Sequence, residues 1–431
     1  MTSERFAPKD AFVWIWLPEA THPLVAGRIE RVGNQYLFNY GRSYLGRKNA
    51  IPIFTPELPL QAGQIEPAGP LTIASALRDG APDTWGRRVI INRLAGGAEF
   101  SADGFLDFDE LTFMLQSGSD RIGALDFQIS ATDYVPREKA NPTLDELQQS
   151  TEMVEDGVPL TPALANALEQ GTAIGGARPK ALINDQGRKY VAKFSSSCDE
   201  YNVVKGEFVA MRLAKLCGLN VASVSLTQAL GKDVLLIERF DRTKAEAGWC
   251  RRAMVSALTR LSLDEIKAAH ASYQDLAEII RARFENARAT LHEMFGRMVF
   301  NILVGNTDDH ARNHAAFWNG ECLALTPAYD ICPQSRVGHE ASQAMLLSGP
   351  ERRSQLIHCL SAALHFHLSE EEALAMISQQ IVCIKGQWND VCDEAGLSQV
   401  DRNFFWRRQF LNPMAFEDIQ NRLPAMAAVL D

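Results

Sequence analysis

Apolar positions change their spacing several times along this chain, and each spacing predicts a different type of element. Residues 12–56 alternate apolar runs with Gly, Asn and Pro, which predicts a small antiparallel sheet. Residues 72–95 and 108–118 have the spacing of helices, whereas residues 121–130 have that of a strand. From about residue 251 the pattern is mostly helical. We therefore predict an α+β protein with a β-rich amino-terminal part and a helical carboxy-terminal lobe.

Capping sequences mark further expected helix starts. A Ser or Thr followed three residues later by Glu can satisfy two backbone N–H groups at once. This pattern occurs at Thr143–Glu146, Ser262–Glu265 and Ser369–Glu372. Another helix is expected from Asn202 to Leu216, ended by Gly218.

A glycine-rich loop at residues 171–180 precedes two short apolar runs. Glycine lets backbone N–H groups approach a phosphate closely, and successive N–H groups form an anion-binding concavity. Gly175, Gly176 and Ala177 are therefore candidate phosphate contacts, and Lys193 in the second run could bring an ammonium group to the phosphates. The Walker spacing is absent from this loop, so a P-loop NTPase is disfavoured. The alternatives are an ordinary turn and a solvated edge lysine.

Two later segments fit a nucleotide site. Glu207, in the expected helix, could pair with Lys193, or it could be a surface glutamate. The apolar run 233–238 then passes into the polar residues 239–242, where a hinge beneath an adenine would lie.

The segment Thr307–Asn313 carries the most specific chemistry. Asp308 and Asn313 have the spacing of a protein-kinase catalytic loop, and Asp330 follows Asn313. In that chemistry one Asp accepts the hydroxyl proton, while the Asn and a later Asp hold magnesium. Asn319-Gly320 between two apolar runs predicts a type I′ hairpin that would bring Asn313 and Asp330 to one end. The alternative is a polar loop followed by an ordinary hairpin.

Several motifs occur together along the chain. They are residues 175–180 (Gly-Gly-Ala-Arg-Pro-Lys), 238–242 (Glu-Arg-Phe-Asp-Arg), 307–313 (Thr-Asp-Asp-His-Ala-Arg-Asn) and 325–330 (Leu-Thr-Pro-Ala-Tyr-Asp), with residues 80–88 and 120–125 in the amino-terminal third. In this combination the chain resembles the HipA family of bacterial serine/threonine kinases, which act as toxins of toxin–antitoxin pairs. The resemblance covers nearly the whole chain. It implies a two-lobed protein-kinase-like fold, divided into an amino-terminal subdomain (1–137), a nucleotide-binding lobe (138–245) and a helical lobe with the catalytic loop (246–431).

The resemblance also implies roles for individual residues. Asp308 would be the base, Asn313 and Asp330 the Mg²⁺ ligands, and Lys193 the lysine that binds the phosphates of ATP. Glu238 and Phe240 would offer backbone groups to adenine, and we expect His310 near the nucleotide. Substrates would be proteins, such as aminoacyl-tRNA synthetases. The partner would be a small helix-turn-helix antitoxin, through which any DNA contact would be indirect.

One position departs from the family pattern. Some members silence themselves by phosphorylating a serine just before the glycine loop. This chain has Ala173 at that position, preceded by Thr172. Thr172 is therefore the remaining candidate for self-phosphorylation.

Composition limits the other possibilities. The chain has 431 residues, with 43 Lys and Arg against 53 Asp and Glu, a net charge of −10. That charge argues against direct binding to nucleic acid or to an anionic membrane. Met1–Arg5 has no apolar signal core, and apolar runs such as 12–17 are too short to span a bilayer. We expect a cytoplasmic protein whose eight scattered cysteines are reduced.

Two other functions remain open at this point. A kinase-shaped co-repressor would use the fold to hold an antitoxin on DNA. A small-molecule phosphotransferase would use the same catalytic residues on another substrate. The intact set of Lys193, Asp308, Asn313 and Asp330 favours an active protein kinase over a pseudokinase.

Overall fold

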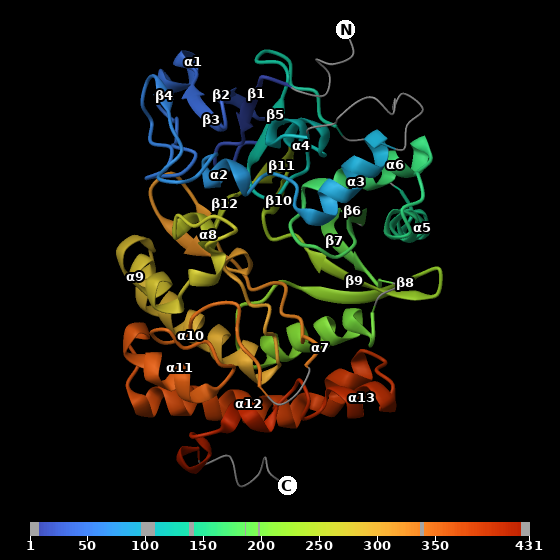
Figure 1. Cartoon of the computed structure of the whole chain (residues 1–431), viewed down its shortest axis with the longest axis vertical. Coiled ribbons are helices and arrows are strands. Elements are labelled where there is room, and N and C mark those ends of the chain that lie inside the picture. Colours follow the sequence, from blue (N-terminus) through green and yellow to red (C-terminus); the bar gives the residue numbers. More distant parts are fainter. Residues whose placement is uncertain are drawn as a thin grey trace. The chain divides into compact units, whose positions relative to one another are not determined.

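The computed structural model covers the whole chain and describes most of it (Figure 1). The described residues are 8–95, 108–137, 142–185, 187–196, 199–336 and 340–423. Met1–Arg5, on which the expectation of no signal segment rests, lies outside these ranges. The chain forms two compact units. The first contains residues 1–198, 227–255 and 317–321, and the second contains residues 199–226, 256–316 and 322–431. The proposed three-part division stays a prediction.

The first unit contains the expected antiparallel sheet near the amino terminus. Its strand order is β4-β3-β2-β1-β5, with all neighbouring pairs antiparallel. The strands are β1 (Asp10–Ile15), β2 (Leu24–Val32), β3 (Gln35–Tyr40), β4 (Gln64–Ile65) and β5 (Leu125–Gln128). The short helices α1 (Arg42–Leu45), α2 (Ser75–Arg78) and α4 (Glu110–Gln116) lie between these strands in sequence.

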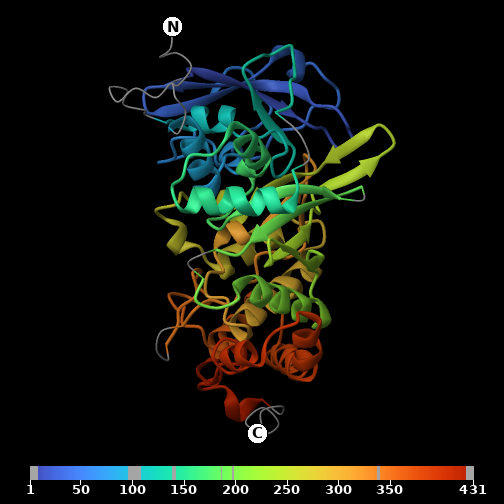
Figure 2. The ribbon, with the colours of Figure 1, turned by 90° about the vertical axis from the view of Figure 1, so that its right-hand side faces the viewer.

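A second sheet in this unit carries the glycine-rich region. Its order is β6-β7-β9-β8, and the strands are β6 (Lys180–Asp185), β7 (Arg188–Phe194), β8 (Val224–Ala229) and β9 (Lys232–Glu238). The helices α3 (Thr84–Ala95), α5 (Leu144–Glu155) and α6 (Pro162–Glu169) pack on it (Figures 1 and 2). Their shared core includes Trp85, Leu147, Leu168 and Phe194, each no more than 1% exposed. Apolar burial therefore fixes three helices against the strands that flank the glycine loop.

The second unit is mostly helical, as the sequence pattern predicts. Its helices are α7 (Val203–Leu216), α8 (Ala257–Arg260), α9 (Tyr273–Arg283), α10 (Ala287–Leu303), α11 (Leu356–Ala362), α12 (Glu370–Glu394) and α13 (Gln399–Phe405). Every residue from 294 to 303 of α10 is buried, so this helix forms the centre of the unit. The hairpin of β10 (Arg242–Ala245) and β11 (Gly248–Arg251) belongs to the first unit. The remaining strands are β12 (Ala253–Ser256), β13 (Ala315–Trp318) and β14 (Leu323–Leu325).

Local predictions were mostly confirmed. Thr143 with Glu146 and Ser369 with Glu372 form capping boxes at the starts of α5 and α12. Asn202 caps α7, which ends at Leu216 as expected. The range 72–95 is broken into α2 and α3, because the segment between them contains Gly80 and Pro82.

One local prediction was wrong, and another was right only in part. No helix starts at Ser262, which instead follows α8 with a positive φ of 55°. Ile266 in the next turn is 91% exposed, so this segment has no apolar face to bury as a helix. The hairpin expected at Asn319-Gly320 does form, because β13 and β14 are neighbours in one sheet, but its connection spans residues 319–322 rather than the two residues of a type I′ turn. There the side chain of Asn319 accepts a hydrogen bond from the backbone N–H of Glu321, which favours an Asx turn.

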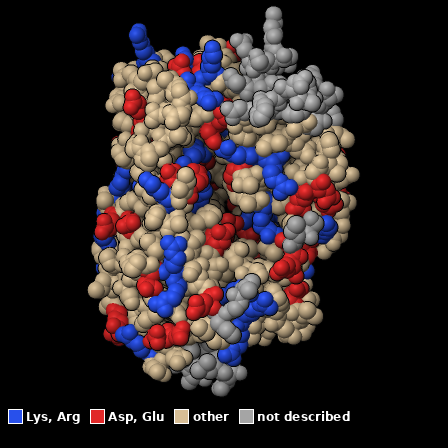
Figure 3. Space-filling view, in the orientation of Figure 1, with Lys and Arg blue, Asp and Glu red and all other residues tan. Residues whose placement is uncertain are grey.

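Surface and thiol chemistry agree with the composition. On the face shown in Figure 3, Lys and Arg side chains are interspersed with Asp and Glu. The cysteines in the described part are free thiols. Among the described helices, none is long and apolar enough to cross a membrane.

Candidate active site

The segment predicted to be catalytic follows the buried helix α10 in the second unit. Gly305 turns the chain with a φ of 70°, and residues 311–313 form a short 3-10 turn, η4. The side-chain amide of Asn313 donates to the backbone carbonyl of Asp308 at 3.4 Å. The loop therefore closes on itself and brings Asp308 and Asn313 together, as their spacing predicted.

Asp330 belongs to the same site. Its negative charge acts on Asp308, and its backbone carbonyl accepts from Asn306 at 3.5 Å. Tyr329 also ties the two segments, because its hydroxyl donates to the carbonyl of Arg312 at 2.7 Å. Asp330 has a φ of 60°, a left-handed conformation that non-glycine residues seldom adopt. Such strain is concentrated at functional sites, where the surrounding structure maintains it.

The carboxylate of Asp308 reaches the surface, yet its surroundings perturb it. Partial burial raises the pKa of Asp308, His310 opposes this rise, and the negative charges of Asp330 and Asp309 add to it. Two carboxylates that repel each other in this way form a site that a divalent cation would stabilise. The amide oxygen of Asn313 and the carboxylate of Asp330 are the oxygen donors that Mg²⁺ prefers.

The residues present fit magnesium better than a transition metal. Across the residues that the structure describes, no group of three or more His, Cys, Asp or Glu side chains could hold a metal ion. Magnesium needs fewer protein ligands, because phosphate and water oxygens complete its octahedron. His310, expected near the nucleotide, lies in the same loop, and its Nδ1 atom is buried without a hydrogen bond in the described structure.

The neighbouring Asp309 has a different environment from Asp308. It is 2% exposed and accepts a hydrogen bond from the hydroxyl of Tyr273. Its other oxygen lies 2.7 Å from Nε2 of His314. Burial, followed by the charge of Asp309, raises the pKa of Tyr273 well above its usual value, so the phenol remains a donor. Asp309 is therefore held inside the protein, whereas the neighbouring Asp308 is exposed.

Sequence reasoning missed this Tyr273–Asp309–His314 cluster. Neither His314 nor Tyr273 was assigned a role from the sequence, because Tyr273 lies on a separate helix, α9, far from His314 along the chain. A cavity of only about 10 Å³ adjoins the cluster, lined in part by Arg297, Asn301 and Asn306. It is too small for any ligand larger than a water molecule.

The glycine loop lies in the first unit. Gly175, Gly176 and Ala177 are exposed, and Gly176 has a φ of 109°, which requires glycine. The ammonium group of Lys180 donates to the carbonyl of Gly175. Lys180 also stands directly opposite Lys193 in the β6–β7 ladder. Both lysines are less than 10% exposed, so two cationic side chains gather beside the loop.

Lys193 is therefore a buried strand residue, and the edge-lysine alternative is wrong. Glu207 on α7 is 2% exposed, which excludes the surface alternative for it as well. Lys180 was not assigned a role from the sequence, although it ends the glycine-rich motif.

The segment after β9 is held by a buried ionic cluster. Asp120 accepts hydrogen bonds from Arg239 at 3.1 Å and from Arg242 at 2.8 Å. Burial alone would raise the pKa of Asp241, but the guanidinium groups of Arg239 and Arg242 outweigh it and hold that pKa at about 2. The motifs at 120–125 and 238–242 thus meet in space.

The residues of the 238–242 motif differ in how deeply they are buried. Arg239, Asp241 and Arg242 face the interior, whereas Glu238 and Phe240 are only half-buried. The ring of Phe240 packs edge-on against Phe317 at 6.0 Å. Glu238 and Phe240, expected beside adenine, are therefore the more accessible members of the motif.

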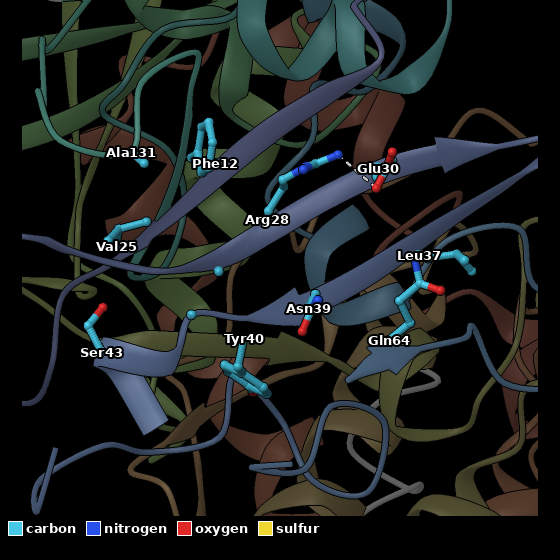
Figure 4. Close-up of a pocket in the computed structure, with 12 residues that line it drawn as sticks. Phe12, Val25, Arg28, Glu30, Leu37, Asn39, Tyr40, Ser43, Gln64 and Ala131 are labelled. Carbon is cyan, nitrogen blue, oxygen red and sulfur yellow. Dashed lines mark ion pairs between the residues drawn. The ribbon is translucent and has the colours of Figure 1, made fainter. Parts of the chain in front are cut away.

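A larger hollow lies elsewhere in the first unit (Figure 4). It has a volume of about 290 Å³ on the amino-terminal sheet and is lined by residues that include Phe12, Arg28, Asn39 and Gln64. Arg28 is paired there with Asp10 and Glu30. None of the residues predicted to act on ATP or substrate lines this hollow.

The structure thus brings the predicted residues together in two sets. Asp308, His310, Asn313 and Asp330 share one loop region of the second unit. The first unit contains Gly175, Gly176, Ala177, Lys193, Glu238 and Phe240.

Comparison with known proteins identifies a family with these features. Residues 172–388, half of the chain, match the HipA-like C-terminal domain, and residues 20–128 match the HipA N-terminal domain. The chain is 27% identical over 186 residues to the serine/threonine-protein kinase toxin HipA of Shewanella oneidensis. That alignment covers 37% of this chain and 42% of the relative. The chain spans about half the length of the curated relatives that it matches.

A solved structure also matches the fold. It is a chain from the complex of HipA, HipB and operator DNA of the Shewanella oneidensis MR-1 toxin–antitoxin system. The TM-score is 0.67 at 18% identity, and the match covers 94% of this chain and 100% of that chain. The likeness confirms the predicted α+β fold class.

Proposed function

Because this chain belongs to the HipA family, as its motifs indicated, we propose that it is an ATP- and magnesium-dependent protein serine/threonine kinase. It would transfer the γ-phosphate of ATP to a hydroxyl group of a cellular protein, as the toxin of a toxin–antitoxin pair. Its sequence relatives include a serine/threonine-protein kinase toxin, which supports the reaction class.

The observation that carries this proposal is the contrast between two adjacent aspartates. Asp308 is exposed and has the kinase spacing to Asn313, whereas Asp309 is buried and bonded to His314. Asp308 is thus the available base for the substrate hydroxyl, which general-base catalysis requires. Asn313 and Asp330 would hold Mg²⁺, which when bound neutralises charge on the phosphates.

The nucleotide would be held mainly by residues of the first unit. Backbone N–H groups of Gly175, Gly176 and Ala177 would cradle the phosphates, and Lys193 would add a positive charge. Glu238 and Phe240 would present backbone groups to adenine. His310 would lie near the nucleotide from the catalytic loop.

We further propose that the partner is a small, basic helix-turn-helix antitoxin. The related HipA structure was solved with HipB and operator DNA, and it supplies the precedent for such a pair. This chain carries a net charge of −10, so contact with DNA is expected through the antitoxin. An aminoacyl-tRNA synthetase is one expected substrate.

Incubation with labelled ATP, Mg²⁺ and a cell lysate tests the proposal against its alternatives. A labelled protein band that is lost with Asp308→Asn supports a protein kinase. A labelled metabolite would instead support a small-molecule phosphotransferase. No labelled product, together with repression of an operator by the chain and an antitoxin, would support a co-repressor.

A further inference from the structure

The amino-terminal region contacts the segment that leads into the glycine loop at three separate points. We propose that Trp85, Gly86 and Thr172 are positioning residues that hold the base of this loop for the phosphates of the nucleotide. The proposal rests on the proposed kinase function. It assigns a task to the amino-terminal motif at residues 80–88, which the catalytic residues do not explain.

Gly86 provides the closest of these contacts. It lies on α3, which packs against the 3-10 turn η2 (Gln170–Ala173) just before the glycine loop. A Cβ atom on Gly86 would lie 1.9 Å from the carbonyl oxygen of Thr172, well inside any real contact distance. Only glycine therefore lets the helix backbone touch the turn.

Trp85 provides the second contact, on the other side of the loop. Its indole N–H donates to the backbone carbonyl of Lys180 at 3.1 Å, and its ring is 1% exposed. The side chain of the same Lys180 donates to the carbonyl of Gly175. Lys180 therefore links the glycine loop to α3, because it is hydrogen-bonded to both Gly175 and Trp85.

Thr172 provides the third contact. Its hydroxyl donates to the carbonyl of Glu169 at 2.6 Å and accepts from the backbone N–H of Gly118 at 3.0 Å. The side chain is 1% exposed. Gly118 precedes the second amino-terminal motif, so both motifs of that region meet the turn before the loop.

These anchors contrast with the loop that they support. Gly175–Ala177 is exposed, and its glycines have many accessible conformations, so ordering it on a nucleotide costs entropy. When the residues on both sides of the loop are held in place, the free loop has fewer conformations, so less conformational entropy is lost when the nucleotide binds. Loss of an anchor should therefore weaken nucleotide binding more than the chemical step.

Thr172→Val and Thr172→Ser form the sharpest test, because valine keeps the shape of threonine and serine keeps its hydroxyl. The binding of ATP with Mg²⁺ would be measured by calorimetry, together with KM for ATP and kcat. Thr172→Val should raise Kd and KM by about 2- to 10-fold, the effect of roughly one hydrogen bond. Its kcat should stay within about 2-fold by the same reasoning. Thr172→Ser should restore most of the affinity.

Trp85→Phe is the second variant, and Trp14→Phe is its matched control. Trp14 on β1 also donates its indole N–H to a backbone carbonyl, that of Ser130 at 3.0 Å, but in the amino-terminal sheet. Both variants should lower the melting temperature to a similar extent. Only Trp85→Phe should raise Kd for ATP.

The outcomes separate this inference from the proposed function. If wild-type protein binds ATP and both Thr172→Val and Trp85→Phe bind it equally well, the anchors are merely structural and the inference is overturned. An equal rise of Kd in Trp14→Phe would overturn it too, because the effect would then be general. If the wild type binds no ATP, the proposed function fails and the inference fails with it.

Discussion

Oδ1 of Asp309 lies 2.7 Å from Nε2 of His314, inside the protein, while the adjacent Asp308 is exposed. Two successive side chains of this loop therefore lie in opposite environments, one buried and one exposed. The carboxylate of Asp309 is bonded to the interior through His314 and Tyr273, whereas that of Asp308 stays accessible. An interior anchor of this kind would fix the loop without using the proposed base, Asp308.

The first prediction distinguishes these two aspartates. Asp308→Asn keeps the size of the side chain but removes the proton acceptor, so kcat should fall by about 10²- to 10⁴-fold while ATP still binds. Asp309→Asn should instead lower the melting temperature, because a buried hydrogen-bonded group is changed. Phosphotransfer and thermal unfolding would be measured on both variants. Full activity in Asp308→Asn beside an inactive but folded Asp309→Asn would refute the assignment.

The second prediction concerns magnesium. Asp330→Ala removes one proposed ligand and also a negative charge beside Asp308. ATP binding should lose its dependence on Mg²⁺, and turnover should fall, because the phosphates lose their shared cation. Calorimetric titration of ATP with and without Mg²⁺ measures this. The same affinity in Mg²⁺ as the wild type would exclude Asp330 as a ligand.

The third prediction concerns Thr172, which the sequence left open for self-phosphorylation. Its hydroxyl is buried and bonded to Glu169 and Gly118, so no kinase can reach it while η2 stays packed on α3. We expect the peptide that contains Thr172 to remain unmodified in an active enzyme. Mass analysis after incubation with ATP and Mg²⁺ checks this. A phosphate on Thr172 would mean that the turn opens during the catalytic cycle.

The fourth prediction concerns acid stability. The folded-state pKa of Asp241 is about 2, below the value of about 3.9 expected in an unfolded chain. A depressed carboxyl pKa contributes stability that is fully present above about pH 4 and is lost as the pH falls towards 2. Asp120, whose pKa is also lowered, acts in the same direction.

The free energy of unfolding would be measured with denaturant at several values between about pH 5 and pH 2. This range roughly covers the folded and unfolded pKa values of Asp241. Asp241→Asn should be less stable near neutral pH, because Arg239 and Arg242 lose a buried partner. It should also lose part of the acid dependence. An unchanged pH slope in this variant would show that other carboxylates control acid unfolding.

Short-range patterns allowed much of the fold to be predicted. The capping box at Thr143 and the helix after Asn202 depend on residues only a few positions apart, and both were found. Ser262 shows where such a pattern fails, since its capping sequence has no apolar face behind it. Local hydrogen bonds alone seldom stabilise a short helix in water.

The sequence by itself determined the family and the α+β fold class, and it also singled out Asp308 as the candidate base, because its spacing to Asn313 is a local property. Only the tertiary structure decided which neighbours each residue has. The bonds of Tyr273 to Asp309, Gly118 to Thr172 and Trp85 to Lys180 join residues 36, 54 and 95 positions apart. Such contacts form when packing of the apolar core brings distant segments together, and no periodicity along the chain records them.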